Sequence, residues 1–404
     1  MNRTDQPTQA PAPRLTTPWG DVDLTRFPED PREQLRAWDA ADTYALRHLA
    51  ESGTDLTGAV TVVGDRWGGL ATALTGAPGC TPTLISDSYL GRQATHANLS
   101  RNGRTTPPLP TTQDAPPAKV DVLIVRVPKS LALLEDQLHR LRPAVHENTV
   151  VLGTGMVKEI HTSTLNLFER IIGPTRTSLA EKKARLIFTT PDLSLSPGPN
   201  PWPHTYQLPP DIGPLSSRPV VNHAGVFCAE HLDIGTRFLL QHLPEVTGAR
   251  SIVDLGCGNG VVGTSAALGH PDADVLFADE SYQAVASARD TYAANAADRP
   301  GSADFQVGDG LADTPPGSVD LVLNNPPFHS HQATTDATAY RMFVQARAAL
   351  RPGGELWVVG NRHLGYHVKL RRLFGNSQLV AGNAKFVILK AIKRESRARG
   401  HRHT

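Results

Sequence analysis

The sequence predicts an α/β protein with two consecutive domains, each built around a mainly parallel sheet. Short buried strands alternate with helical stretches in both halves of the chain, which is the order that parallel strands with crossover helices require. A proline-rich stretch separates the halves, and the length of 404 residues exceeds one ordinary domain and suits two.

The first half shows this alternation from residue 60 onward. Strands are expected at residues 60–64, 82–87, 120–127 and 150–152, and helices at 70–74 and 131–141. The strands are rich in valine, leucine and isoleucine, and the second helix repeats apolar residues at helical spacing. This half is therefore predicted to fold as one α/β domain.

The second half repeats the plan with sharper signals. Strands are expected at residues 251–256, 275–278, 304–307, 320–323 and 355–360, with helices at 261–268, 283–297 and 338–350. A last strand at 385–391 is expected to pair antiparallel at the far side of the sheet. The similar layout of the halves predicts a duplicated domain, whose first copy has lost its glycine-rich signature.

The proline-rich stretch at residues 191–219 sets the domain boundary. Proline fixes φ and removes an amide donor, so this composition forbids long helices and predicts a linker or an extended wrap. We place the boundary near residue 205. The expected parts are a disordered extension at 1–18, domains at 19–205 and 206–393, and a basic tail at 394–404. The tail suits either a solvated segment or an RNA-contacting arm.

The composition is that of a soluble globular protein, with 39% hydrophobic and 20% charged residues. No long apolar run predicts a membrane span, and the polar, proline-rich start lacks the apolar core of a secretory signal. The three cysteines are far apart without CxxC spacing, which argues against a disulfide framework or a zinc site and favours the cytoplasm. The net charge of +1 excludes a chain that is basic throughout, but it allows a local basic patch for nucleic acid.

A glycine-rich turn lies between the first strand and the first helix of the second half. We assign to a cofactor site its residues Asp254, Gly256, Cys257, Gly258, Asn259 and Gly260. Glycines allow a sharp turn and a close approach of ligand to backbone. The glycine pattern alone also suits dinucleotide-binding folds.

Three aspartates shift the prediction toward S-adenosylmethionine as the cofactor. Asp254 precedes the glycines, in a position to interact with the cationic methionine end. Asp279 ends the next strand and can accept hydrogen bonds from both ribose hydroxyls, or it caps the following helix instead. Asp309 stands in Gly-Asp-Gly, where it can accept from the adenine amine, although that tripeptide is also ordinary turn chemistry.

The stretch from Val319 to Phe328 is the candidate catalytic motif. A buried strand runs into Asn325-Pro326-Pro327-Phe328. The Asn325 oxygen and the Pro326 carbonyl can accept both hydrogens of an –NH2 group, and Phe328 offers a face for a planar group. Asn325 is also expected to border the cofactor. Methyl transfer to such an amine requires no metal, and the motif leaves adenine, cytosine, guanine and a glutamine amide open as substrates.

Several stretches in both halves resemble a known family, the bacterial ribosomal RNA guanine-N2 methyltransferases. In the second half these stretches are residues 253–263, 278–281, 325–329 and 361–366. The branch that acts on large-subunit RNA is similar at residues 86–89, 127–132, 182–185, 232–238 and 361–375. The resemblance covers most of the chain beyond its first residues.

The resemblance implies two tandem Rossmann-like class I methyltransferase domains, of which the first is degenerate. The first domain would help to hold RNA, and the second would use S-adenosylmethionine to methylate the exocyclic N2 amine of a guanine in 23S rRNA. The cofactor role falls on the positions Asp254, Gly256, Gly258 and Asp279, and base binding falls on Asn325 and Phe328. Ribosomal RNA is the expected partner of a cytoplasmic, monomeric enzyme with neither a metal nor a membrane partner.

A few residues depart from the family pattern or extend it. Cys228 stands where the family tends to carry serine, and the proline-rich extension is not a family feature. In the first domain, Arg66 and Trp67 occupy the turn after the first strand, where their bulk would fill the cofactor's space. Arg362 is a candidate contact for RNA phosphate or a cation in water, and His363 is expected to be structural.

Three other functions stay open at this point. A small-subunit (16S) rRNA guanine-N2 methyltransferase and a protein-glutamine methyltransferase would use the same two motifs. A non-catalytic RNA-binding assembly factor would keep the fold without the chemistry, and the intact glycine and Asn-Pro-Pro-Phe motifs argue against it.

Overall fold

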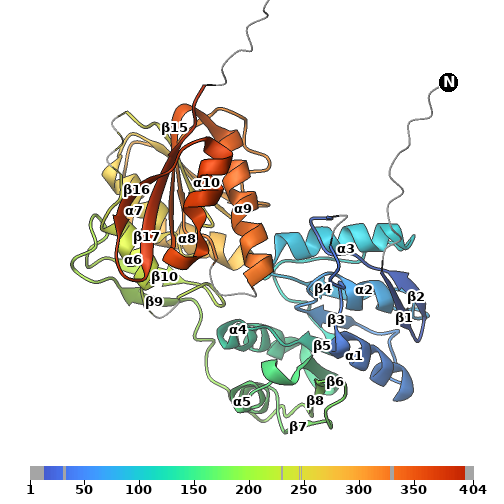
Figure 1. Ribbon diagram of the computed structural model, residues 1–404. Coiled ribbons are helices and arrows are strands. Elements are labelled where there is room, and N and C mark those ends of the chain that lie inside the picture. The colour runs from blue at the N-terminus through green and yellow to red at the C-terminus, as the bar shows by residue number, and fades with distance from the viewer. Residues whose placement is uncertain are drawn as a thin grey trace, which may run out of the picture. The chain divides into compact units, whose positions relative to one another are not determined.

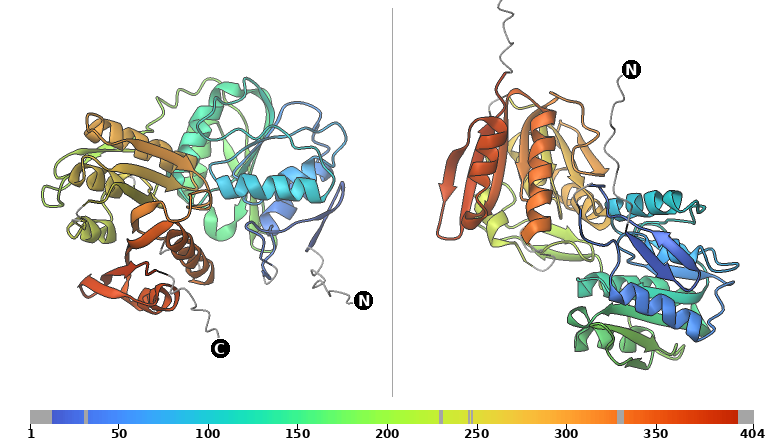
Figure 2. Two further views of the ribbon diagram at one scale, coloured as in Figure 1. Left: turned by 90° about the horizontal axis from the view of Figure 1, so that it is seen from above. Right: turned by 45° about the vertical axis from the view of Figure 1, so that its right-hand side comes forward.

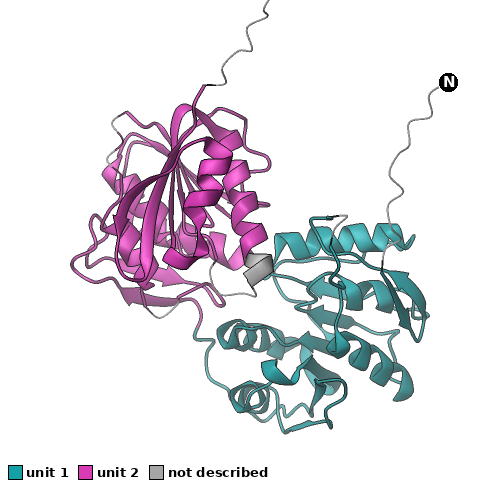
Figure 3. Ribbon diagram, viewed as in Figure 1, with its two compact units in different colours: residues 1–201 teal, residues 202–404 magenta. Residues whose placement is uncertain are grey.

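The computed structural model of the chain describes residues 13–30, 33–228, 231–244, 246, 248–327 and 332–395. The chain divides into two compact units, residues 1–201 and 202–404, each with its own sheet and core (Figure 3). The division falls slightly before the position near residue 205 that the proline-rich stretch indicated. Among the described residues, no helix is long and apolar enough to cross a membrane.

The first unit contains a sheet in which parallel strands are bordered by an antiparallel pair (Figure 1). In the described part of this unit the strand order is β4 (Thr83–Ile85), β3 (Val60–Val63), β5 (Val120–Arg126), β6 (Val145–Met156), β8 (Ala184–Thr189), β7 (Thr175–Thr177). Strands β4, β3, β5 and β6 are parallel, whereas β8 and β7 run antiparallel to their neighbours. A separate hairpin is formed by β1 (Arg14–Thr17) and β2 (Gly20–Asp23).

Helices cover both faces of this first sheet. They are α1 (Ala40–Glu51), α2 (Gly69–Leu74), α3 (Tyr89–Arg101), α4 (Leu131–Leu141) and α5 (Thr162–Ile171), with the short 3₁₀ helices η1 (Arg142–Ala144) and η2 (Val157–Glu159). Leu46 of α1 and Leu70 of α2 belong to the apolar cluster on one face, and Leu138 of α4 and Phe168 of α5 to the cluster on the other. The central strands are therefore buried on both sides, which explains their continuous apolar runs.

The second unit has the same kind of sheet with one more strand. In its described part the order is β13 (Ala303–Val307), β12 (Asp274–Asp279), β11 (Ser251–Leu255), β14 (Val319–Asn324), β15 (Leu350–Asn361), β17 (Phe386–Ile392), β16 (Gln378–Gly382). The strands from β13 to β15 are parallel, and β17 pairs antiparallel with β15, as expected for the last strand. A hairpin of β9 (His204–Gln207) and β10 (Pro219–Asn222) precedes this sheet.

The second sheet is also covered by helices on both faces (Figure 2). They are α6 (Ile234–Leu240), α7 (Val261–Gly269), α8 (Tyr282–Ala296), α9 (Gln332–Ala349) and α10 (Tyr366–Phe374), with the short η3 (Arg362–Leu364). Helices α6, α7 and α8 pack on one face, and α9 and α10 pack on the other. The prediction of an α/β protein with a mainly parallel sheet in each half is therefore confirmed.

Several elements differ from the expected ones. The disordered extension expected over residues 1–18 is wrong at its end, because Arg14–Thr17 forms β1; residues 1–12 lie outside the described residues. The two hairpins and helices α1, α3, α5, α6 and α10 are not among the expected elements. Helix α3 lacks a strong apolar stripe, so tertiary packing stabilises it, whereas α5 and α10 do repeat apolar residues at helical spacing, a local signal that could have located both.

The strand registers align the two units residue by residue. Strand β3 lies between β4 and β5 just as β11 lies between β12 and β14. The last residue of β3 pairs with Val125, and the last residue of β11 pairs with Asn324. The residues that follow, Arg126 and Asn325, therefore occupy equivalent positions at the carboxyl edge of the two sheets.

Candidate active site

The residues that the motifs single out gather at the carboxyl edge of the second sheet. Strands β11, β12 and β14 are adjacent and parallel, so the glycine turn, Asp279 and Asn325 lie at one edge. The chain leaves β11 toward β12 on one side and returns to β14 on the other. In open α/β sheets, ligands bind at the carboxyl edge where the strand order switches in this way.

The glycine turn uses backbone conformations that favour glycine at three positions. Gly256, Gly258 and Gly260 have φ angles of +74°, +51° and +76°. At Gly260, which precedes α7, a Cβ would stand 2.6 Å from the Cα of Ala288 in α8. At Gly258, a Cβ would meet no described atom within 4 Å. Gly260 is thus required for packing, whereas Gly258 presents bare backbone to open space and leaves room for a ligand.

Asp254 supports the turn from the end of β11. Its side chain is buried, and Oδ2 accepts a hydrogen bond from the backbone N–H of Gly263 in α7 at 2.7 Å. Burial raises the pKa of Asp254 to about 8, although that hydrogen bond acts in the opposite direction. The carboxyl group thereby fixes the first turn of α7 against the strand.

Asp279 holds the glycine turn from the neighbouring strand. Its Oδ2 accepts from the backbone N–H of Gly258 at 3.0 Å, and its Oδ1 accepts from the N–H of Ser281 at 3.0 Å. Burial raises the pKa of Asp279. The cap of α8 is Ser281, whose hydroxyl accepts from the N–H of Ala284 at 3.1 Å. Asp279 therefore links the glycine turn to the start of the next helix.

The two other residues of the turn are buried. Cys257 packs into the apolar cluster beneath it, and burial raises the pKa of its thiol well above the ordinary value. The Asn259 Nδ2 donates to Oδ1 of Asn222, the last residue of β10, at 3.0 Å. The β9–β10 hairpin thus reaches the glycine turn, a long-range contact that no local sequence pattern indicates.

Asp309 lies beyond β13, at the outer end of the same edge. Its Oδ1 forms an ion pair with Nη2 of Arg341 at 3.2 Å, and its carbonyl accepts from Nε2 of Gln345 at 2.9 Å. Both partners belong to α9. These contacts hold the turn after β13, and the contact of Asp309 with an adenine amine stays a prediction.

Asn325 follows β14, and one of its side-chain atoms has no partner in the described part of the chain. Its Nδ2 donates to Oγ1 of Thr236 at 2.8 Å, and that hydroxyl in turn donates to Oδ2 of Asp233 at 3.3 Å. This chain fixes which end of the amide faces α6. Its Oδ1 is buried and accepts from no described residue, which costs about 1–3 kcal/mol unless a ligand donates to it. Pro326 is buried beside it, and Phe328 lies outside the described residues.

Residues outside the two motifs complete the site. Thr236 orients the amide of Asn325, and Asn222 contacts the glycine turn through Asn259. Asp233 caps α6 by accepting from the N–H of Thr236 at 2.9 Å, and this N-cap spacing is a signal that could have located the helix. The contact of that helix with the catalytic motif depends on the packing of segments distant in sequence.

The turn and the strand ends together fit S-adenosylmethionine. The cofactor carries no pyrophosphate, so it needs close approach to the backbone rather than a phosphate-binding helix end, and the open side of Gly258 provides that approach. Asp279 stands beside this open side through its contact with the Gly258 N–H. Within the described ranges, no cluster of three His, Cys, Asp or Glu side chains could hold a metal ion.

The equivalent edge of the first unit is closed by a buried arginine. Arg126, at the position of Asn325, is 1% exposed. Its guanidinium pairs with Asp39 at 2.6 Å, with Asp42 at 3.3 Å and with Glu159 at 3.0 Å. Burial opposes the charge, but these three carboxylates raise the pKa of Arg126 and keep it protonated. No acceptor equivalent to the Asn325 oxygen is therefore present at this position of the first unit.

A second arginine fills the turn of the first unit. Arg66 takes the position of Gly258 and pairs with Glu159 at 2.8 Å. Trp67 instead packs against the apolar core, with the guanidinium carbon of Arg26 5.6 Å from its ring centroid. Arg66 rather than Trp67 therefore stands where the second unit has open space.

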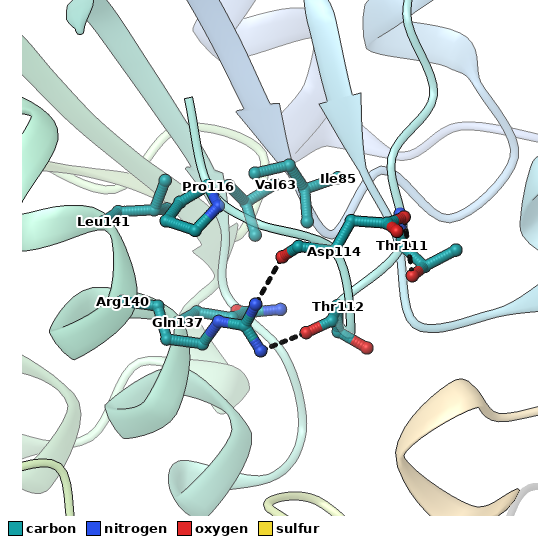
Figure 4. A pocket seen from close by; sticks show the side chains of 9 residues that line it. All are labelled: Val63, Ile85, Thr111, Thr112, Asp114, Pro116, Gln137, Arg140 and Leu141. Atoms are coloured by element: carbon teal, nitrogen blue, oxygen red, sulfur yellow. Dashed lines mark hydrogen bonds between the residues drawn. The ribbon is translucent and has the colours of Figure 1, made fainter. Parts of the chain in front are cut away.

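A small cavity of the first unit lies beside the end of β3 (Figure 4). Arg140 of α4 closes one side by donating to the carbonyls of Thr112 and Asp114. This loop follows a segment that runs beside β4, where the second unit has β13: the N–H of Leu84 donates to Pro108 at 3.0 Å. The segment that contains Pro108 therefore takes the place of β13 beside this cavity. The cavity lacks the glycine turn of the second unit.

The fold and the arrangement at the second sheet define an S-adenosylmethionine-dependent methyltransferase of class I type. Comparison with known families specifies it further. A family model described as the RLMG N-terminal domain matches residues 12–193, and one described as the methyltransferase small domain matches residues 217–390.

Curated relatives share both halves of the chain. The ribosomal RNA large subunit methyltransferase G of Streptomyces avermitilis is 70% identical over 94% of this chain and 99% of its own length. The protein of that name from Ectopseudomonas mendocina is 48% identical over 94% of this chain and 100% of its own length. The chain therefore belongs to the ribosomal RNA large subunit methyltransferase G family, and the predicted family and branch are confirmed.

A solved structure shows the same fold. The T. thermophilus 16S rRNA N2 G1207 methyltransferase (RsmC), in complex with AdoMet and guanosine, has a TM-score of 0.71 and 20% identity, and the match covers 95% of this chain and 98% of that one. At this identity the likeness concerns the fold alone, and it agrees with the methyltransferase-like fold predicted for both halves.

Proposed function

We propose that the second unit transfers a methyl group from S-adenosylmethionine to the exocyclic N2 amine of a guanine in 23S rRNA. Membership of the large subunit methyltransferase G family supports the RNA and the subunit. The structural observation that carries the chemistry is the buried Oδ1 of Asn325 at the carboxyl edge of the sheet, which accepts from no described residue.

The catalytic motif acts by positioning the amine. S-Adenosylmethionine supplies an electrophilic methyl group when bound. The Asn325 Oδ1 accepts one N–H of the amine and the Pro326 carbonyl accepts the other, so the nitrogen lone pair is held in one direction. Thr236 keeps the Asn325 oxygen in place through its hydrogen bond to Nδ2. Phe328, which follows the prolines in sequence, is proposed to stack on the base.

The cofactor site is assigned to the glycine turn and to the strand ends on either side. Gly256, Gly258 and Gly260 give the turn its shape, with Cys257 and Asn259 buried beneath it. We assign the ribose contact to Asp279 and the adenine contact to Asp309. Asp254 serves the cofactor through the turn that it supports by its hydrogen bond to α7.

The first unit is proposed to hold RNA without binding the cofactor. Its β7–β8 turn exposes Lys182 and Lys183, and the N–H of Val157 donates to the Lys183 carbonyl at 2.8 Å, which brings the exposed Lys158 beside them. Such a group of cations suits a phosphate backbone. We propose 23S rRNA as the partner, a monomer as the working state and the cytoplasm, where ribosomal RNA resides, as the location.

Asn325→Ala tests the proposed chemistry. The substrate is ribosomal RNA from a strain that lacks this protein, and mass spectrometry reads the modified nucleoside. We expect the rate of N2-methylguanine formation to fall by at least about a hundredfold, because the amine loses an acceptor that positions it. Calorimetry should show S-adenosylmethionine binding within about threefold of the wild type. Retained methylation in this variant would contradict the mechanism.

The same assay separates the other candidate functions. Methyl incorporation into 16S rather than 23S rRNA would assign the enzyme to the small subunit. Incorporation into a glutamine-containing peptide and not into RNA would assign it to proteins. RNA binding without any cofactor binding by the wild-type chain would leave an assembly factor.

A further inference from the structure

A second buried acceptor lies at the same edge as Asn325. Asn361 is the last residue of β15, the strand next to β14 in the sheet. Its Oδ1 is buried and, among the described residues, has no hydrogen-bond donor. Asn361 also precedes η3, but its side chain makes no capping hydrogen bond to that helix. The capping role that asparagine often has therefore does not account for this amide.

The two asparagines face the same side of the sheet. Side chains along a strand alternate between the two faces. Leu323, two residues before Asn325, and Val359, two residues before Asn361, belong to one apolar cluster, which includes α6 and α7. The same helix α6 contacts Asn325 through Thr236 and packs against β15. The edge thus carries, at the ends of two neighbouring strands and on one face, two amide oxygens that have no donor among the described residues.

The first unit has an apolar residue where the second has Asn361. Val125 pairs with Gly153, and the equivalent Asn324 pairs with Val358. Three residues further along, β6 ends at Met156 and β15 ends at Asn361. Methionine offers only a weak acceptor. The amide is therefore present where the methylation motif is intact and absent where arginines close the edge.

We propose that Asn361 selects guanine by accepting a hydrogen bond from the ring N1–H, a role that rests on the proposed function. Guanine presents N1–H directly beside its N2 amine, whereas adenine and cytosine present a ring nitrogen lone pair beside theirs. With Asn325 and Pro326 on the amine, an acceptor on the neighbouring strand meets a proton only in guanine. With the other two bases, the Asn361 oxygen, in the orientation that the structure shows, would face a ring nitrogen lone pair in a buried site, which is unfavourable.

The test begins by locating the modified nucleotide. The full chain is incubated with 23S rRNA from a strain that lacks this protein, and mass spectrometry of fragments identifies the base and the nitrogen that receive the methyl group. Methyl at guanine N2 satisfies the proposed function. Methyl at an adenine or cytosine amine would overturn the proposed function and the role of Asn361 together.

The second step asks for the role of N1–H at that nucleotide. The rRNA is rebuilt by ligation with either guanosine or 2,6-diaminopurine riboside at the site; the analogue keeps the N2 amine but has no proton on N1. We expect the wild type to prefer guanosine in kcat/KM by at least about tenfold. Asn361→Leu should lower kcat/KM for guanosine, leave the analogue unchanged and thereby remove the preference. Asn361→Asp, which keeps an acceptor, should retain it.

Two results would overturn the role of Asn361 while leaving the proposed function intact. One is a wild-type enzyme that methylates both RNAs equally well, a measurement that requires no variant. The other is an Asn361→Leu enzyme that loses activity on both RNAs by the same factor. His363→Leu, at an exposed position two residues further, serves as the matched control and should keep the wild-type preference. Calorimetry with S-adenosylmethionine verifies that each variant retains a formed cofactor site.

Discussion

The two units share one architecture, but only the second has an open binding edge after its first central strand. In both, a glycine with φ of +76° begins the helix after that strand: Gly68 in the first unit and Gly260 in the second. A Cβ at Gly68 would stand 2.6 Å from the Cα of Thr95 in α3, and a Cβ at Gly260 would stand 2.6 Å from the Cα of Ala288 in α8. The shared geometry indicates that this glycine serves helix packing, which both units need, rather than ligand binding.

The equivalent helical N–H donates to an aspartate side chain in both units. In the first, Asp65 reaches it from within the turn and accepts from Ala71 at 2.9 Å. In the second, Asp254 reaches it from the strand below and accepts from Gly263 at 2.7 Å. The second unit thereby supports its helix from the strand, without a carboxyl group in the turn, and the side of the turn at Gly258 is left open for a ligand.

The units differ at two positions, where the second unit has an amide oxygen without a described donor and a glycine that faces open space. The first unit has Arg126 where the second has Asn325, and Arg66 where the second has Gly258. Its arginines are paired with carboxylates within the unit, whereas the asparagine oxygen of the second unit has no described donor. The degenerate unit thus has a closed ion-pair network in place of an open site.

The largest effect is expected when that network is broken. Arg126→Met removes the only described ion-pair partner of the buried Asp42, and it leaves Asp39 and Glu159 to Arg66 alone. We expect the first unit to lose about 3–5 kcal/mol of unfolding free energy, measured by urea denaturation. Arg170→Met, which breaks the exposed pair with Glu135, should have a much smaller effect. Equal losses of unfolding free energy in the two variants would show that the Arg126 network stabilises the first unit no more than an exposed ion pair does.

The next effect concerns the glycine that Arg66 replaces. Gly258→Arg introduces the first unit's residue into the second, at a φ of +51° and into the space assigned to the cofactor. We expect affinity for S-adenosylmethionine to fall by at least about a hundredfold, which is about 2.7 kcal/mol, as measured by calorimetry. Gly317→Arg is the matched control, because that glycine has a φ of +72° and open space around it but lies away from the site. Similar losses in both variants would point to backbone strain instead of a blocked site.

The sequence was sufficient to predict the parallel core and the two motifs. Central strands buried on both faces are continuous apolar runs, and the glycine and Asn-Pro-Pro-Phe motifs combine short spacing with unusual residue types. The role of Arg66 in closing the first unit also follows from one substitution in a short turn. These features are local, so a single sequence contains them.

The remaining features depend on interactions between distant segments. Arg126 looks in the sequence like the polar end of a strand, and only the fold brings Asp39 and Glu159 to it. Thr236 orients Asn325 across 89 positions of sequence, and Asn222 meets Asn259 across 37. The strand register likewise brings the amide oxygens of Asn325 and Asn361 to one edge, at the ends of β14 and β15, and no motif specifies that register.

A smaller effect is expected from the pH dependence of Asp254, which has the apolar Val62 as its counterpart in the first unit. Burial raises the pKa of Asp254 from its ordinary value of 3.8 to about 8. The folded protein therefore keeps a proton that the unfolded chain releases, so stability is lost as pH rises from about 4 to 8. Between about pH 6 and 8, we expect the wild type to lose about 2 kcal/mol relative to Asp254→Asn, which can still accept from Gly263. Urea titrations of both proteins across this range check the difference, and parallel curves would contradict it.

The smallest effect is expected at the β7–β8 turn, where Lys182 and Lys183 have φ angles of +45° and +65°. Two-residue hairpin turns of this kind favour Asn-Gly, because non-glycine residues in left-handed conformations cost about 1 kcal/mol or more. The corresponding turn of the second unit avoids them: the Asn383 side chain accepts from the N–H groups of Lys385 and Phe386 at 2.9 and 2.7 Å. Replacing the two lysines with Asn-Gly should stabilise the first unit by about 1 kcal/mol in urea denaturation.

The same double variant tests why the first unit keeps a strained turn. If the lysines bind RNA phosphate, the variant should bind 23S rRNA more weakly, and the slope of log K against log salt should decrease by about one for each phosphate that the protein no longer neutralises. Replacing both lysines with arginines keeps the charge and the strain, and it should keep the salt slope as well. A gain in stability together with unchanged RNA binding would separate the turn from RNA recognition and would remove the support that these lysines give to an RNA-holding first unit.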